Sequence, residues 1–191
     1  RLTIIAHAPL LTATILVYSA ILILLGRSAV ANVRELEALG LTDSLTHLPN
    51  RRALHEDVER LEEGGEEVAL AMIDLDSFKQ VNDHYGHAVG DQLIELCAQL
   101  IRDVCGEEAR CYRLGGDEFA AVMAGKVSGT ILEGMCRTLL ERLGTPVTLG
   151  HRQIAVGASI GLTRSLADNR VPSSEMLRRA DVAMDMSKRG G

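Results

Sequence analysis

The stretch Arg113-Leu114-Gly115-Gly116-Asp117-Glu118-Phe119 links two largely apolar runs, residues 109–114 and 119–123. Two glycines between strand-like runs predict a tight β-hairpin. Glycine suits the tip because it adopts positive φ and lets a ligand approach the backbone closely. Two adjacent carboxylates at such a tip repel each other, so the stability of the hairpin does not explain Asp117 and Glu118. A bound divalent cation would explain them.

Further carboxylates follow a second apolar run. Residues 68–73 are continuously apolar and predict a buried central strand, which ends in Asp74-Leu75-Asp76. The strand therefore carries carboxylates to its C-terminal end, where they can meet those of the hairpin. Mg²⁺ prefers a few carboxylate oxygens together with phosphate oxygens and water, and no His/Cys cluster points to zinc.

Length and composition limit what the chain can be. Its 191 residues allow one domain and an appendage, and 47% apolar with only 3% aromatic residues predicts an aliphatic core. The formal net charge of −6 argues against a nucleic-acid partner, which needs a basic patch. The four cysteines have no metal-like spacing and are expected to be reduced and partly buried.

The motifs together resemble the GGDEF domain of diguanylate cyclases, from about Leu41 to the C-terminus. The signature itself is Gly115–Phe119. Its supporting motifs occur in the expected order: Asp43–Thr46, Leu48–Arg52, Asp74–Lys79, Asn82-Asp83, Gly86-His87, Gly90-Asp91 and Ser159–Gly161. The resemblance implies a palm-like βαββαβ fold, as in nucleotidyl cyclases: an α+β architecture with a mainly antiparallel central sheet.

The spacing of apolar residues, together with glycine and proline residues that end helices and strands, predicts the remaining secondary structure. Helices are expected over residues 51–63 (capped by Asn50), 91–104, 128–143 and 173–188, all on one face of the sheet. A short turn is expected at 77–80, and a further hairpin over 147–149 and 153–163.

The resemblance also implies roles for residues near the carboxylates. Asp74, the Leu75 carbonyl, Asp117 and Glu118 would hold two Mg²⁺ ions, with Mn²⁺ as an alternative metal. Asp117 would take the proton of the attacking hydroxyl. Three residues would face the triphosphate: Phe78 and Lys79, in the turn with free backbone N–H groups, and Lys188 near the C-terminus. Asp43 and Arg51 are interpreted as members of fold-supporting ion pairs.

Base selection is expected at the next motifs. Guanine presents N1–H and N2–H₂ donors on one edge, and a carboxylate accepts from both. The family places guanine contacts at the positions of Asn82 and Asp91, and in some members a further substrate contact at His87. Asp91 also suits a helix N-cap, and His87 also suits a loop histidine packed on the base pocket. Asp91 predicts GTP rather than ATP.

The implied reaction condenses two GTP into cyclic di-GMP and two pyrophosphates. The 3′-hydroxyl of one GTP attacks the α-phosphate of the other, and because each domain holds one GTP, a homodimer is required. Two alternatives stay open: a non-catalytic GTP-binding domain that regulates another module, and a membrane scaffold segment that mainly dimerises. Gly106 and Ala109 stand where many members carry an inhibitory Arg-x-x-Asp product site, so no product inhibition through that site is expected.

The N-terminal residues predict a membrane anchor. No charged side chain occurs from Leu2 to Gly26, which is long enough to span a bilayer. We assign 1–27 to a transmembrane helix, 28–41 to a linker helix with a weak coiled-coil seam, and 42–191 to the GGDEF domain. Arg27 and Arg34 favour a cytoplasmic domain on the inner membrane. A secretory signal ending near Ala29-Val30-Ala31 and a buried core helix are the alternatives.

Overall fold

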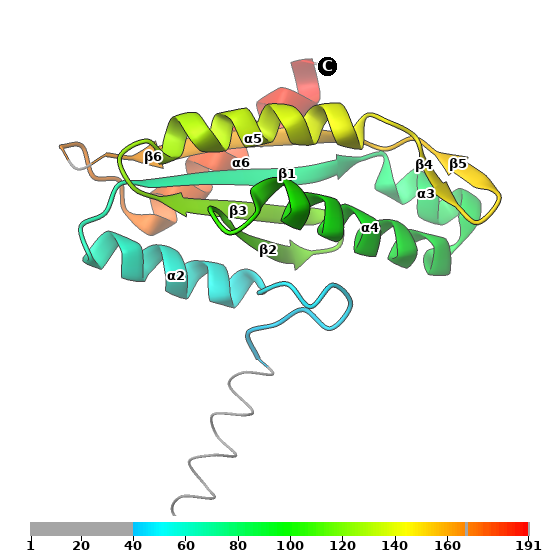
Figure 1. Ribbon diagram of the computed structural model, residues 1–191, viewed down its shortest axis with the longest axis horizontal. Coiled ribbons are helices and arrows are strands. Elements are labelled where there is room, and N and C mark those ends of the chain that lie inside the picture. The colour runs from blue at the N-terminus through cyan, green and yellow to red at the C-terminus, as the bar shows by residue number, and fades with distance from the viewer. Residues whose placement is uncertain (1–39, 167, 191) are drawn as a thin grey trace, which may run out of the picture. The chain divides into compact units, whose positions relative to one another are not determined.

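Strand β1 (Val68–Asp76) runs through the middle of a four-stranded sheet in the computed structural model, which describes residues 40–166 and 168–190 (Figure 1). The sheet order is β2-β3-β1-β6, and every neighbouring pair is antiparallel. The other strands are β2 (Arg110–Gly115), β3 (Glu118–Ala124) and β6 (Gly157–Ser165). The hairpin predicted around the two glycines is β2–β3, and the prediction of an α+β fold with an antiparallel central sheet is confirmed.

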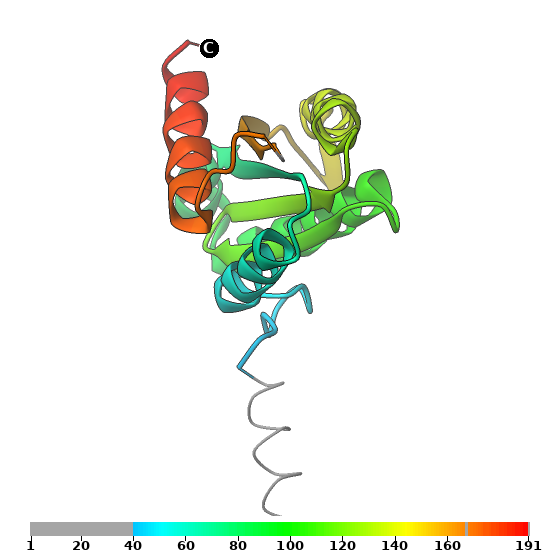
Figure 2. The same ribbon diagram turned by 90° about the vertical axis from the view of Figure 1, so that its left-hand side faces the viewer.

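Helices cover both faces of this sheet, so the prediction that they lie on one face is wrong (Figures 1 and 2). Odd-numbered residues of β1 pack in one apolar cluster with α4 (His87–Cys105) and α5 (Ser128–Leu143). Even-numbered residues pack in a second cluster with α2 (Arg51–Glu63) and α6 (Ser173–Gly190). The continuous apolar run of β1 is the reason, because a strand without a polar face has to be covered on both sides.

The helices follow their predicted limits except near the site. Asn50 caps α2 as expected, since its Oδ1 accepts from the backbone N–H groups of Arg52 and Ala53. The predicted turn at 77–80 is instead the start of a helix, α3 (Phe78–Tyr85), and α4 begins at His87 rather than at Asp91. Gly86, at φ 85°, separates the two helices by a single residue, a break that glycine alone makes without strain.

The last predicted strand, 153–163, divides between two sheets. Its start is β5 (Arg152–Ile154), which pairs with β4 (Val147–Leu149) in a separate hairpin, whereas β6 joins the edge of the main sheet beside β1. Alternating apolar residues predict a strand but do not say which partner it pairs with, so the break at 155–156 was not visible in the pattern.

The predicted transmembrane helix, and the linker helix up to residue 39, lie outside the described residues. Within 40–166 and 168–190, no helix combines the length and the apolar character needed to cross a bilayer.

Candidate active site

The end of β1 and the tip of the β2–β3 hairpin meet at one cleft of about 660 Å³. Asp74 stands opposite Glu118 in the strand register, and the backbone N–H of Leu75 donates to the carbonyl of Asp117 at 3.2 Å. The two carboxylate-bearing segments therefore lie side by side, as the spacing predicts. The side chains and backbone that line the cleft are those of Asp74, Leu75, Asp76, Ser77, Phe78, Lys79, Asp117, Ala158, Ser159, Ser187 and Lys188.

Asp74 is the buried carboxylate of this cleft, with 7% of its surface exposed. Burial raises its pKa, the negative charges of Asp117 and Asp76 act in the same direction, and a hydrogen bond from Lys188 opposes them. Lys188 reaches it from α6, with Nζ 2.8 Å from Asp74 Oδ2. The raised pKa therefore comes first from burial of the carboxyl group, with Asp117 and Asp76 adding to it, and a cation bound beside Asp74 would favour the ionised form.

Glu118 is turned away from the others. Its carboxylate accepts a hydrogen bond from Arg51 Nη2 at 2.7 Å, and it lines a separate cavity between α2 and α6. Of the predicted metal ligands, the structure therefore gathers Asp74, Leu75 and Asp117 in the cleft but not the Glu118 side chain. Its role as a ligand stays a prediction.

The donor set of the cleft fits Mg²⁺. Carboxylates and a backbone carbonyl are hard oxygen donors, and no described residue brings sulfur or imidazole to the cleft. In the described part of the chain, no three His, Cys, Asp or Glu side chains come close enough to hold a metal ion by themselves. Mg²⁺ commonly takes one or two carboxylates and completes its shell with water and substrate phosphates, so the set suits a metal that arrives with a nucleotide.

Two of the three predicted phosphate-facing residues lie at the start of α3, and the third, Lys188, lies near the end of α6. Phe78 and Lys79 line the cleft directly after Ser77, whose φ of 61° turns the chain out of β1. The first backbone N–H groups of a helix have no carbonyl partner within it and are available to anions. Within the described part of the chain, Lys79 and Lys188 are the two lysines that line the cleft.

The predicted guanine contacts lie on α3 and α4 and are not among the residues that line the cleft. No donor from the described residues reaches the buried Asn82 Oδ1, which costs about 1–3 kcal/mol unless a ligand N–H supplies one. His87 and Asp91 are exposed on the first turns of α4. The alternative that Asp91 caps this helix is wrong, because α4 starts four residues earlier, at His87.

Gly90 is a positioning residue that the motifs alone did not explain. It is buried in α4, and a Cβ there would clash with Asn82 Oδ1 and lie 2.9 Å from Asn82 Cγ and 3.2 Å from Phe78 Cζ. Glycine weakens a helix interior by about 1 kcal/mol relative to alanine, so its presence fits this close approach.

The predicted contact of Asn82 with guanine implies that Gly90→Ala should weaken GTP binding about tenfold or more, because the methyl group displaces Asn82. Isothermal titration calorimetry with GTP and Ca²⁺ measures this. Adding Asn82→Ala to Gly90→Ala should lower the affinity for GTP little further, since the displaced Asn82 side chain no longer contributes to binding. Unchanged affinity in Gly90→Ala would contradict this role.

Two further residues of the cleft have no individual role in the sequence-based predictions. Asp76 accepts a hydrogen bond from Ser159 Oγ at 2.8 Å, and Ser159 stands opposite Asp74 in the strand register. Asp76 and Ser159 belong to the family motifs Asp74–Lys79 and Ser159–Gly161, so the sequence does mark both positions. Only the pairing of β1 with β6 reveals that they meet.

Arg113 connects the hairpin tip to the N-terminal turn of the domain. Its Nη2 donates to the carbonyl of Gly116 at 2.9 Å, and its Nη1 lies 2.9 Å from Asp43 Oδ1. Although burial raises the pKa of Asp43, hydrogen bonds from Arg113 and Thr46 hold it below its ordinary value of 3.8. The N-terminal turn is thus joined to the hairpin, in agreement with the interpretation of Asp43 as part of an ion pair.

Replacing Asp43 with asparagine should lower the free energy of unfolding by about 1 kcal/mol at neutral pH, because the charge that pairs with Arg113 is lost. A lowered pKa means that the carboxylate stabilises the fold above its unfolded pKa and stops doing so as pH falls below about 3.8. Urea unfolding across pH 3–7 should therefore show the two proteins converging in acid. A constant difference across that range would contradict the role of this charge.

The fold and the cleft define a class before any comparison: α+β domains in which an antiparallel sheet, covered by helices on both faces, carries carboxylates at one end. The family model described as "Diguanylate cyclase, GGDEF domain" matches residues 40–191. The chain belongs to the GGDEF-domain family.

Individual proteins and a solved structure are similar to this chain as well. The chain is 36% identical to the cyclic di-GMP phosphodiesterase PdeR of Escherichia coli, over 82% of this chain and 24% of that one. It is 32% identical to the diguanylate cyclase VdcA of Vibrio cholerae, over 79% and 45%. The crystal structure of the coiled coil and GGDEF domain of DgcB from Caulobacter crescentus, in complex with c-di-GMP, has a TM-score of 0.74 at 28% identity, over 87% and 92%. The chain thus spans about a quarter of PdeR and under half of VdcA.

Proposed function

We propose that this domain is a diguanylate cyclase that condenses two GTP into cyclic di-GMP and two pyrophosphates. The observation that supports this best is the convergence of Asp74 and Asp117 on one cleft, with Lys79 and Lys188 beside them. Anionic oxygens for a metal and cations for a triphosphate are the two requirements of phosphoryl transfer, which depends on positioning and charge stabilisation.

Each residue then has a defined task. Asp74, the Leu75 carbonyl and Asp117 would hold Mg²⁺, with Glu118 joining them if it leaves Arg51. Bound magnesium would neutralise the triphosphate and lower the pKa of the 3′-hydroxyl. Lys79 and Lys188 hold the phosphates, and Lys188 exchanges the Asp74 carboxylate for a phosphate oxygen. Asp117 takes the 3′-hydroxyl proton.

The nucleotide base and the partner complete the proposal. Asn82 and Asp91 hold the guanine, and His87 supplies a further contact. One domain holds one of the two reacting nucleotides, so two copies of the chain face each other to bring a 3′-hydroxyl to an α-phosphate. Pairing two reactants in this way accounts for up to about 7–11 kcal/mol of the barrier.

A second function is favoured by one observation. The likeness to PdeR, a protein named as a phosphodiesterase, supports a GTP-binding domain that regulates another module without making product. The two functions separate in one assay: the purified full chain is incubated with GTP and Mg²⁺, and cyclic di-GMP is measured by mass spectrometry. Product from the wild type and none from Asp117→Ala supports the cyclase. A dimer that binds GTP and yields no product supports the regulator.

The proposed anchor has its own test. We place residues 1–27 in the inner membrane with the domain on the cytoplasmic side, supported by the absence of charge from Leu2 to Gly26. Membrane fractionation followed by protease protection should recover the chain in the membrane, with its C-terminal part cleaved only from the cytoplasmic side. A chain recovered in the soluble fraction would contradict the anchor.

Product titration should leave the initial rate unchanged. Gly106 and Ala109 follow α4 where an inhibitory Arg-x-x-Asp would stand, and the residues between them, Glu107 and Glu108, repel the phosphates of cyclic di-GMP. Initial rates at increasing added product measure this. Strong inhibition that disappears when residues 106–109 are changed would contradict the expectation.

A further inference from the structure

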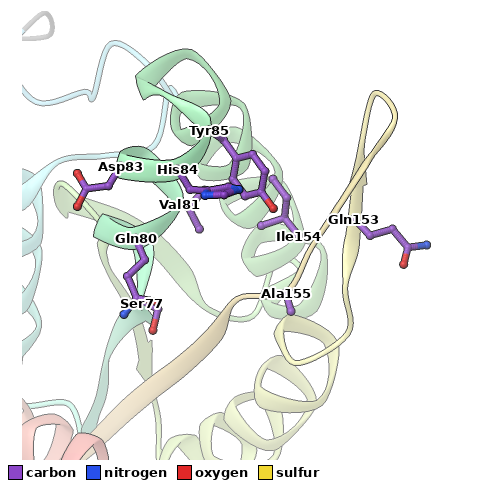
Figure 3. Close-up of a pocket in the computed structure, with 9 residues that line it drawn as sticks. All are labelled: Ser77, Gln80, Val81, Asp83, His84, Tyr85, Gln153, Ile154 and Ala155. Carbon is purple, nitrogen blue, oxygen red and sulfur yellow. The ribbon is translucent and has the colours of Figure 1, made fainter.

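A second cavity lies beside the cleft, between α3 and the link from β5 to β6 (Figure 3). We call it the α3 cavity; its volume is about 500 Å³. Its lining residues are Ser77, Gln80, Val81, Asp83, His84, Tyr85, Gln153, Ile154 and Ala155. Of the residues that the structure describes, Ser77 is the one that lines both this cavity and the cleft. None of the residues given a task in the proposed reaction lines it, so the cyclase proposal leaves it unexplained.

The walls of the α3 cavity suit a flat ring. His84 and Tyr85 form an edge-to-face pair with ring centroids 4.4 Å apart, and both rings are visible at the cavity in Figure 3. Val81 and Ile154 are buried and supply an aliphatic surface. Aromatic rings and aliphatic side chains around a cavity of this size are typical of sites for small planar ligands.

The polar groups favour a neutral ring with a hydrogen-bonding edge. Gln80 offers both a donor and an acceptor, and its side chain lies next to Ser77 in Figure 3. The Asp83 carboxylate and the Gln153 amide point away from the cavity in the same view. Among the described residues, no lysine or arginine lines the cavity itself, and the Arg152 guanidinium lies 5.8 Å from the centroid of the Tyr85 ring. A nucleobase meets these conditions.

The position of Ser77 connects this cavity to the phosphate region. Its positive φ turns the chain from β1 into α3, so the cavity and the cleft open on either side of one residue. Because both His84 and Ser77 line the α3 cavity, a ligand whose ring contacts His84 can place its phosphate at Ser77.

We propose that the α3 cavity binds the base of a second nucleotide, whose phosphate lies at the rim beside Ser77. Each chain then takes two nucleotides, one at Asn82 and one at His84. The inferred position of the phosphate rests on the proposed function, because Ser77 also lines the cleft. The inferred position of the base rests on the α3 cavity alone.

The test is the stoichiometry of binding. The full chain is titrated with 3′-deoxy-GTP and Mg²⁺ by calorimetry, since a nucleotide without a 3′-hydroxyl cannot condense. We expect two nucleotides per wild-type chain, and one per chain in Gln80→Leu/His84→Ala. Both side chains are exposed, so the fold should survive, which thermal unfolding checks. His151→Ala removes an exposed histidine outside the α3 cavity and should leave two.

Each outcome has a definite meaning. One nucleotide per wild-type chain overturns the proposal, and so does a stoichiometry of two that Gln80→Leu/His84→Ala leaves unchanged. Loss of one nucleotide in Asn82→Ala, with the other kept, supports two separate base sites. Two nucleotides bound by a protein that makes no cyclic di-GMP would refute the cyclase and leave this inference standing.

Discussion

Cyclic di-GMP formation should fall by about a thousandfold or more when Asp74 is replaced by asparagine. The substitution keeps the shape of the side chain and removes the charge that would hold a metal at the end of β1. A loss of this size corresponds to about 4 kcal/mol of transition-state stabilisation. Initial rates at saturating GTP and Mg²⁺ measure it, and Asp103→Asn, an exposed carboxylate on α4, is the matched control.

The same variant should not lose stability. The folded state raises the pKa of Asp74, chiefly by burial, so its ionised form is less favourable in the fold than in the unfolded chain. That cost appears as pH rises above the ordinary value of 3.8 and is present at neutral pH. The free energy of unfolding of Asp74→Asn should therefore equal or exceed that of the wild type at pH 7. Full activity, or an activity loss explained by unfolding, would contradict the proposed role.

Gly161→Ala should cause the largest loss of stability, about 3 kcal/mol. A Cβ at this position of β6 would clash with the backbone of α6, at the Ala180 carbonyl and the Met184 N–H, and would lie 2.9 Å from Met184 Cα. Backbone cannot rotate aside as a side chain can, so the whole helix has to shift. Because α6 carries Lys188, activity should fall as well.

Urea unfolding of the full chain measures this effect. Gly134→Ala in α5 is the matched control, because a Cβ there meets nothing within 4 Å and alanine favours a helix by about 1 kcal/mol. The two glycine substitutions should therefore change stability in opposite directions. Equal stability of Gly161→Ala and the wild type would show that α6 does not rest directly on β6.

Sequence alone could predict the parts of the site that depend on local pattern. The hairpin at Gly115-Gly116 and the strand that ends in Asp74 are each encoded within a few residues. The cleft follows once two acidic strand ends are known to pair. The α+β class was predictable for the same reason, because each element carries its own periodicity or turn signal.

The rest depends on contacts between distant segments. The apolar run of β1 is compatible with one or two covered faces until its helices are placed, and the one-face prediction was wrong. The direction of Glu118 depends on Arg51, which arrives from the start of α2. Lys188 meets Asp74 only because α6 packs on β6 with no side chain between their backbones at Gly161. No local pattern specifies such pairings, since they follow from how whole elements dock.

The most direct test of the central claim is a crystal structure of the chain with 3′-deoxy-GTP and Mn²⁺, with the metal located by anomalous scattering. We predict a metal peak in the cleft, in coordination range of the Asp74 and Asp117 carboxylates, with the triphosphate at the start of α3. A nucleotide bound with no metal between these two residues, or a metal bound at a different place, would contradict the account.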